Sequence, residues 1–203
     1  MEKITSKALR IMLGSVIVLY ILDQVTKWSI VFNYTEPFQN YVMEKTPIIQ
    51  GSELMNFSII RIHNTGVAFG FGNGTVWAPI VFLMVQVLAL IGLIVLLRRG
   101  FFATRLLKIA WVCIMAGVLG NMTDRLLQGF FLSGAEQLSF LTNLSRGYVV
   151  DFLDFSFPWI QTAAFPNGYH WPAFNVADSC VCIAAALFFI ASFFPPHKQE
   201  EKA

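Results

Sequence analysis

The last apolar stretch of the chain opens with Phe174-Asn175-Val176-Ala177-Asp178-Ser179 and continues to Phe194. A stretch of this length is a candidate transmembrane helix, because roughly 20 mostly apolar residues cross a hydrocarbon core of about 30 Å. Asp178 lies just inside its start. A charged side chain in hydrocarbon costs about 2.5 kcal/mol or more, so an acid at this place is a candidate functional residue. The stretch therefore predicts a membrane protein with a site that includes Asp178.

The composition also indicates an integral membrane protein. Of the 203 residues, 56% are hydrophobic and 13% are charged, and the mean hydropathy is +0.63. The first apolar stretch is too long for a signal peptide and is followed by no cleavage site of small residues, so a retained anchor is expected. No repeat or linker divides the chain, which predicts one membrane domain over residues 1–203. The predicted spans are approximately residues 9–32, 77–97, 106–128 and 173–194.

The distribution of Lys and Arg favours one orientation of these spans. Basic residues flank the spans at both termini and in the connection between the second and third spans, whereas residues 33–76 and 129–172 hold few. Because basic loops stay in the cytoplasm, both termini are expected there and the two long segments outside. This placement, with a net charge of +2, makes nucleic acid an unexpected partner. The flanking residues are Lys3, Lys7, Arg10, Arg98, Arg99, Arg105, Lys108, Lys198 and Lys202.

The two outer segments carry strand patterns. Residues 54–62 alternate imperfectly between two faces, and residues 148–157 form a second strand-like stretch closed by Pro158. Residues 64–72 are rich in glycine, which predicts a turn whose backbone can approach a ligand closely. A small sheet on the outer face of the membrane is therefore expected.

Two of the acids near the predicted outer ends of the spans have cations beside them. Asp23 precedes Lys27 by about one helical turn, a spacing at which an acid and a base pair and neutralise each other at the interface. Asp124 is next to Arg125, and an aspartate held near an arginine stays ionised. A structural role is favoured for both acids. Gly117 and Gly120 in the same span would let another helix approach closely.

Asp178 and Asp151 are the stronger candidates for chemistry. Asn175 fits a helix N-cap with Asp178 at the third helical position, so helix capping explains Asp178 as well as catalysis does. Asp151 lies within the apolar residues 149–153. Two carboxylates that share a proton can activate water for attack on an amide carbonyl. On the residues alone, Asp124 competes with Asp151 as the partner of Asp178.

Other reactive side chains indicate no further chemistry. All three cysteines, Cys113, Cys180 and Cys182, fall inside predicted spans, so a disulfide framework is excluded and apolar packing is expected. The histidines are dispersed and no metal-ligand spacing occurs. No metal or other cofactor is therefore expected.

Three other functions compete with hydrolysis by a pair of aspartates. A small proton-coupled carrier also uses intramembrane carboxylates, but carriers place them near the bilayer midplane and often contain repeats. Here the acids gather toward one face, and the spans show no duplication. A serine–lysine peptidase needs a Ser and Lys pair at the outer face, which the sequence does not place there. A pure scaffold predicts that Asp151→Asn or Asp178→Asn leaves function intact.

Five blocks spread over most of the chain resemble the lipoprotein signal peptidases (signal peptidase II), which are intramembrane aspartic proteases. One block alone would be a weak signal, whereas five in matching order are specific. In order they are Asp23-Gln24-Val25-Thr26-Lys27, Asn64-Thr65-Gly66-Val67-Ala68-Phe69, Gly120-Asn121-Met122-Thr123-Asp124-Arg125, Val149-Val150-Asp151-Phe152 and the opening block Phe174-Asn175-Val176-Ala177-Asp178-Ser179.

The resemblance implies an aspartic endopeptidase that cleaves diacylglyceryl-modified prolipoproteins on the amino side of the lipidated cysteine and releases the signal peptide. It makes Asp151 and Asp178 the catalytic pair, and so chooses Asp151 over Asp124. The implied enzyme uses no metal or cofactor. The residues implied to bind substrate or brace the site are Asn64, Gly66, Asn121, Arg125, Asn175, Asp23, Lys27 and Asp124.

The resemblance also implies partners and a location. The partners are lipid-modified prolipoproteins and membrane phospholipid, with no nucleic acid, and the protein is expected to act as a monomer. The location is the bacterial cytoplasmic (inner) membrane, with several passes and the active site near the extracytoplasmic face.

The implied fold class is an all-α membrane protein. It has four transmembrane helices, a small extracytoplasmic β-sheet called a β-cradle, and a short interfacial helix. Two segments, residues 33–52 and 131–146, are longer than the family pattern. The second holds enough apolar residues for an interfacial helix on the outer leaflet, and these are Phe131, Leu132, Leu138, Phe140, Leu141 and Leu144.

Overall fold

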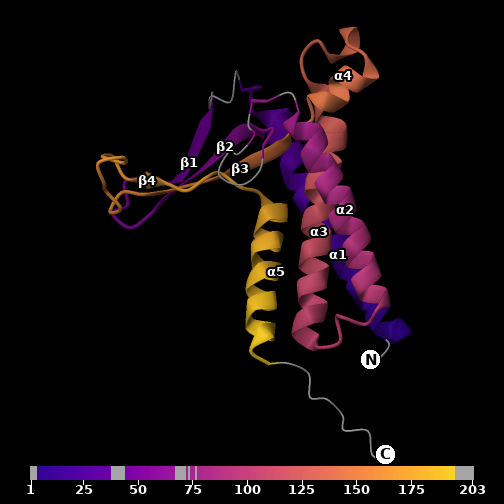
Figure 1. Cartoon of the computed structure of the whole chain (residues 1–203). Helices are drawn as coiled ribbons and strands as arrows, with labels where there is room; N and C mark the ends of the chain where they lie inside the picture. Colours follow the sequence, from indigo (N-terminus) through magenta and orange to yellow (C-terminus); the bar gives the residue numbers. More distant parts are fainter. Residues whose placement is uncertain (1–3, 38–43, 67–71, 73, 76, 195–203) are drawn as a thin grey trace, which may run out of the picture.

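The computed structural model describes residues 4–37, 44–66, 72, 74–75 and 77–194. Four helices cover the four apolar stretches, and a sheet extends sideways from one end of them (Figure 1). The expectations for Lys3, Lys198, Lys202 and most of the glycine-rich turn lie outside the described residues. The helices are α1 (Ser6–Asn33), α2 (Ala78–Arg98), α3 (Arg105–Leu127) and α5 (Val176–Ser192).

Three helical segments of the described chain are long and apolar enough to cross a membrane, and they are Ser6–Asn33, Ala78–Arg98 and Arg105–Phe131. The fourth helix, α5, is apolar but has 17 residues. It begins at Val176, three residues later than predicted, because Asn175 takes an extended conformation and caps it. The structure is therefore mostly helical with at least three candidate spans.

Helix α3 is the centre of the bundle and packs against α1, α2 and α5. Its glycines permit the close contact that the sequence predicted. A Cβ atom at Gly117 would lie 2.6 Å from the carbonyl oxygen of Ala177 on α5, and one at Gly120 would collide with the carboxylate of Asp23 on α1. These approaches bring the polar residues of three helices to one level of the bundle.

Helix α2 presents apolar side chains on nearly all sides. Among its residues only Ala78, Pro79 and Leu93 are buried in the protein. A helix that is apolar all round and exposed in an isolated chain is typical of one that faces lipid.

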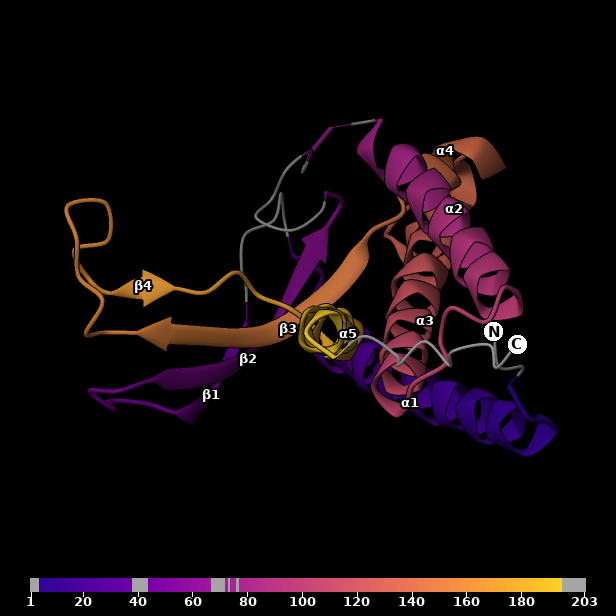
Figure 2. The ribbon, with the colours of Figure 1, turned by 60° about the horizontal axis from the view of Figure 1, so that its bottom comes forward.

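The sheet has four antiparallel strands in the order β1-β2-β3-β4. The two predicted strands are confirmed as β2 (Asn56–Asn64) and β3 (Val149–Phe157). The sequence did not indicate β1 (Lys45–Ile49), which contains a proline, or β4 (Tyr169–His170), which is only two residues long. The expected small sheet is therefore present, but its four strands make the term all-α inexact. The sheet projects past α5 (Figure 2).

The pairing of β2 with β3 explains the imperfect alternation in the sequence. The register shifts between Ile59 and Ile62, where β2 has one residue more than β3, so the alternation of side chains along β2 changes phase. After the shift, Ile62 pairs with Asp151 and Asn64 pairs with Val149. The irregularity thus sets which residues of β2 lie beside Asp151.

The two faces of the projecting sheet differ in polarity. On one face the rings of Phe57 and Phe155 stack with centroids 4.6 Å apart, and Phe155 stacks on Phe174 at 5.7 Å. On the other, Asp154 lies 2.8 Å from the ammonium of Lys45. The sheet therefore has an apolar and a polar surface.

The long segment at residues 131–146 contains the predicted short helix, α4 (Phe140–Ser145), after two 3-10 turns, η2 (Gln128–Phe131) and η3 (Ala135–Gln137). Phe140 and Leu141 are 67% and 73% exposed, whereas Leu132 and Leu144 are half-buried. The placement of α4 on a membrane surface stays a prediction.

Candidate active site

Two carboxylates from different elements of the chain come together at the end of the bundle that carries the sheet. Asp151 lies on β3 and Asp178 lies in the first turn of α5. Asn175 contacts both: its side-chain amide donates to Asp151 Oδ1 at 2.7 Å, and its backbone N–H donates to Asp178 Oδ2 at 3.2 Å. The chain leaves β3 at Phe157, passes through β4 and returns to the side of β3, where Phe174 pairs with Leu153 just before α5 begins. The capping box predicted at Asn175 and Asp178 is present.

A second asparagine approaches Asp151 from β2. The side-chain oxygen of Asn64 accepts the backbone N–H of Gly66 at 3.0 Å. Since that oxygen is occupied, its amide nitrogen faces Asp151 Oδ2 and donates to it at 2.9 Å. The predicted residues Asn64 and Gly66 therefore lie together, with Asn64 in contact with the carboxylate.

A third asparagine approaches Asp178 from α3. Asn121 accepts from the Lys27 ammonium at 2.8 Å and donates from its amide nitrogen to Asp178 Oδ1 at 2.8 Å. Lysine can only donate, so the orientation of the Asn121 amide follows from its neighbour. Each carboxylate of the pair thus accepts two N–H hydrogen bonds.

The environment of the two acids is not symmetric. Burial raises the pKa of Asp151 well above its ordinary value, and the charge of Asp178 raises it further, against the hydrogen bonds from Asn64 and Asn175. Asp151 is only 2% exposed. Asp178 instead lies at the positive end of a helix and lines an open cleft. This arrangement favours a proton on Asp151.

Below the pair lies a buried charge cluster. The Lys27 ammonium is 3.0 Å from Asp23 and 3.1 Å from Asp124, and all three side chains are at most 1% exposed. The predicted pairing of Asp23 with Lys27 therefore forms, but deep in the protein rather than at an exposed interface. Asp124 also differs from expectation, because its cation is Lys27 and not the adjacent Arg125.

Arg125 binds the turn that carries Asn64. Its guanidinium donates to the carbonyl oxygens of Thr65 and Gly66 and lies 5.5 Å from the centre of the Phe82 ring on α2. The predicted residue Arg125 is thus buried beside the site, where it fixes the end of β2 to α3.

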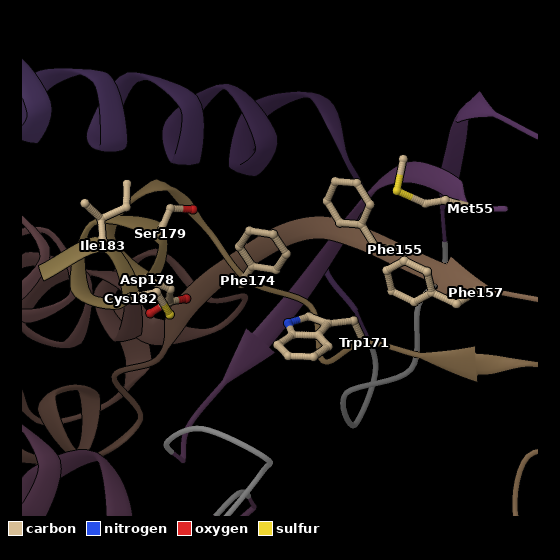
Figure 3. A pocket seen from close by; sticks show the side chains of 9 residues that line it. All are labelled: Met55, Phe155, Phe157, Trp171, Phe174, Asp178, Ser179, Cys182 and Ile183. Atoms are coloured by element: carbon tan, nitrogen blue, oxygen red, sulfur yellow. The ribbon is translucent and has the colours of Figure 1, made fainter. Parts of the chain in front are cut away.

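An apolar cleft of about 540 Å³ opens beside Asp178, between the start of α5 and the apolar face of the sheet (Figure 3). Asp178, on the first turn of α5, contributes carboxylate oxygens to a wall that is otherwise almost entirely apolar. Sequence reasoning missed this cleft, since its walls come from strands and loops far apart in the chain. The lining residues are Met55, Phe155, Phe157, Trp171, Phe174, Asp178, Ser179, Cys182 and Ile183.

Comparisons with known proteins agree over nearly the whole chain. The sequence profile of the family described as signal peptidase (SPase) II matches residues 15–194. The chain is 36% identical over 189 residues to a lipoprotein signal peptidase of Nitratidesulfovibrio vulgaris (strain DP4), covering 92% of each protein. It is 32% identical over 184 residues to a lipoprotein signal peptidase of Alteromonas mediterranea, covering 90% of this chain and 80% of the relative. A solved structure described as a bacterial membrane enzyme is similar with a TM-score of 0.64 and 26% identity, over 95% of this chain and 93% of that one.

Proposed function

The chain belongs to the signal peptidase II family, an aspartic protease family, and we propose that it removes signal peptides from lipid-modified prolipoproteins with Asp151 and Asp178 as the reacting pair. The contact that carries this proposal is the double hydrogen bond of Asn175 to the two carboxylates. A residue that touches both acids holds them close to one common point. That arrangement suits a single water molecule activated by one acid beside a carbonyl polarised by the other.

Asp178 is the base in this proposal. It takes a proton from water while the water oxygen attacks the carbonyl carbon of the scissile peptide bond. Asp151 is the acid and gives its proton to the carbonyl oxygen, which yields a neutral tetrahedral diol. The high pKa that burial and Asp178 give Asp151 suits this role.

The second step breaks the carbon–nitrogen bond. The proton held by Asp178 passes to the leaving nitrogen, and a diol hydroxyl returns a proton to Asp151 as the carbonyl re-forms. The products are the signal peptide with a free carboxylate and the mature protein with a free amino group on its lipidated cysteine. Both acids end in their starting states, so the cycle needs no cofactor.

The apolar cleft accounts for the preference for a lipidated substrate. Its wall is formed almost wholly by apolar side chains and ends at Asp178, so acyl chains bound there would bring the modified cysteine to the acids. Burying apolar surface stabilises such a complex by roughly 25 cal/mol per Å².

The proposed setting is the bacterial cytoplasmic membrane, with α1, α2, α3 and α5 as four spans and the sheet at the extracytoplasmic face. Arg98, Arg99, Arg105 and Lys108 lie at the end of the bundle opposite the sheet, where the rule for positive loops places the cytoplasm. The described part of the chain also begins, at the start of α1, and ends, after α5, at that same end (Figure 1). A monomer suffices for the proposed chemistry, because one chain supplies both acids.

The test uses purified full-length protein with a lipidated precursor peptide and its unlipidated counterpart. We expect cleavage of the lipidated peptide alone, before its modified cysteine. Asp151→Asn and Asp178→Asn should each fold and lose roughly 10²- to 10⁴-fold in rate. The matched control is Asp154→Asn, which changes a neighbouring acid of β3 that pairs with Lys45. Full activity in either of the first two variants would overturn the proposal.

A further inference from the structure

The buried cluster beneath the reacting pair contacts the backbone at two particular points. Asp23 Oδ1 accepts the backbone N–H of Ala177 at 2.8 Å. Asp124 Oδ2 accepts the backbone N–H of Val150 at 3.0 Å. Ala177 immediately precedes Asp178, and Val150 immediately precedes Asp151. Each buried carboxylate therefore holds the peptide group next to one reacting acid.

Lys27 joins these two contacts into one unit. Its ammonium lies between Asp23 and Asp124 and donates in addition to Asn121. These three interactions use all the hydrogens of the ammonium group. Asn121 in turn donates to Asp178. Lys27 is therefore connected to the reacting pair by three routes, through Asp23, through Asp124 and through Asn121.

The cluster leaves none of its carboxylate oxygens without a partner. Gln24 donates to Asp23 Oδ2 at 3.1 Å and to Asp124 Oδ1 at 3.2 Å. With the contacts to Lys27, Ala177 and Val150, all four oxygens accept hydrogen bonds. A buried polar network that is fully satisfied is rigid, whereas a partly satisfied one is costly.

We propose that Asp23, Lys27 and Asp124 are positioning residues that set the distance and orientation of Asp151 and Asp178, through the backbone before each acid and through the amide of Asn121. They touch neither substrate nor the reacting atoms. This inference rests on the proposed function, because it assigns a purpose to the geometry of that pair.

The first test is a double-mutant cycle between Lys27 and Asn121. Lys27→Met should lower kcat for the lipidated precursor by roughly 10- to 100-fold with little change in KM, as outer partners of reacting groups do. In the background of Asn121→Leu the same change should cost less, by roughly 3-fold or more, since the amide through which Lys27 acts is gone. Equal losses in the two backgrounds would overturn the part of the assignment in which Lys27 acts through Asn121.

A second test avoids the two unpaired acids that Lys27→Met leaves buried. Asp23→Asn keeps an oxygen for the N–H of Ala177 and leaves Lys27 balanced by Asp124, whereas Asp23→Leu removes the acceptor. Asparagine should retain a kcat at least several-fold above leucine at equal thermal stability. Equal kcat values for the two variants would overturn the positioning role of the contact between Asp23 and the backbone N–H of Ala177.

The controls separate this inference from the proposed function. Tyr20→Phe removes another polar contact between α1 and α3, to Thr123 at 3.2 Å, and should leave kcat unchanged. If Asp151→Asn and Asp178→Asn remain active, the proposed function fails first. If they are inactive while Lys27→Met keeps the kcat of the unchanged protein, the proposed function stands and the positioning role fails.

Discussion

The side-chain amide of Asn175 donates a hydrogen bond of 2.7 Å to Asp151, although the two residues belong to a helix cap and a strand. The same asparagine caps α5 by accepting the backbone N–H of Asp178 at 2.9 Å. One side chain thus begins the last helix and ties it to the sheet. The geometry of the site and the start of α5 depend on each other for this reason.

Replacing Asn175 should cost activity far more than stability. Asn175→Ala removes the side-chain cap of α5, which costs about 1 kcal/mol of stability. It also removes the hydrogen bond that ties Asp151 to the start of the helix that carries Asp178. A displacement of about 1 Å in a reacting group can cost roughly 100-fold in rate. Thermal unfolding and kcat are the measurements. Thr104→Ala, which removes the cap of α3, should lose similar stability and keep its kcat; equal kcat values for both variants would contradict the prediction.

Enlarging Gly117 should push α5 away from α3. Its new Cβ would meet the backbone of Ala177, which cannot move as a side chain would, so Gly117→Ala should destabilise the protein by about 1–3 kcal/mol and lower kcat. In α2, Gly92 has open space where a Cβ would stand. Gly92→Ala should be neutral or up to about 1 kcal/mol more stable. The free energy of unfolding of both variants decides the comparison.

Filling the apolar cleft should weaken binding of lipidated substrate without affecting the chemistry. Ile183 lines the cleft, so Ile183→Trp should raise KM for a lipidated precursor by roughly 10-fold and leave kcat nearly unchanged. Ile190 is exposed on the same helix but outside the cleft. Ile190→Trp should therefore leave both constants unchanged, and a KM effect shared by the two variants would argue against acyl chains in the cleft.

The pH dependence of cleavage should be bell-shaped. Asp151 must hold a proton, and because its pKa is raised, activity falls only when the pH rises through that value. The pair must also keep one negative charge to activate water, so activity falls again at low pH, when the pair binds a second proton. The measurement is kcat against pH over the range in which the protein stays folded. A flat profile from mildly acid to alkaline pH would contradict proton sharing by the pair.

Local sequence patterns predicted much of the secondary structure of this protein. The four apolar stretches specify helices, since only a helix satisfies its own backbone in lipid. The capping box at Asn175 and Asp178 could be recognised because both partners lie within one turn. The strands β2 and β3 were visible through alternation, whereas β1 and β4 were not, because short strands depend on their neighbours for definition.

The sequence by itself determined a membrane protein with acids near one end of its helices, since apolar length and costly buried charge can be read residue by residue. Only the tertiary structure decided which cation belongs to which acid. Lys27, not Arg125, lies beside Asp124 because α1 packs on α3 at Gly120, and Arg125 instead turns toward the strand end at Gly66. It also decided that a cleft exists beside Asp178. These ion pairs and the cleft depend on contacts between segments far apart in the chain, and no local sequence pattern indicates such contacts.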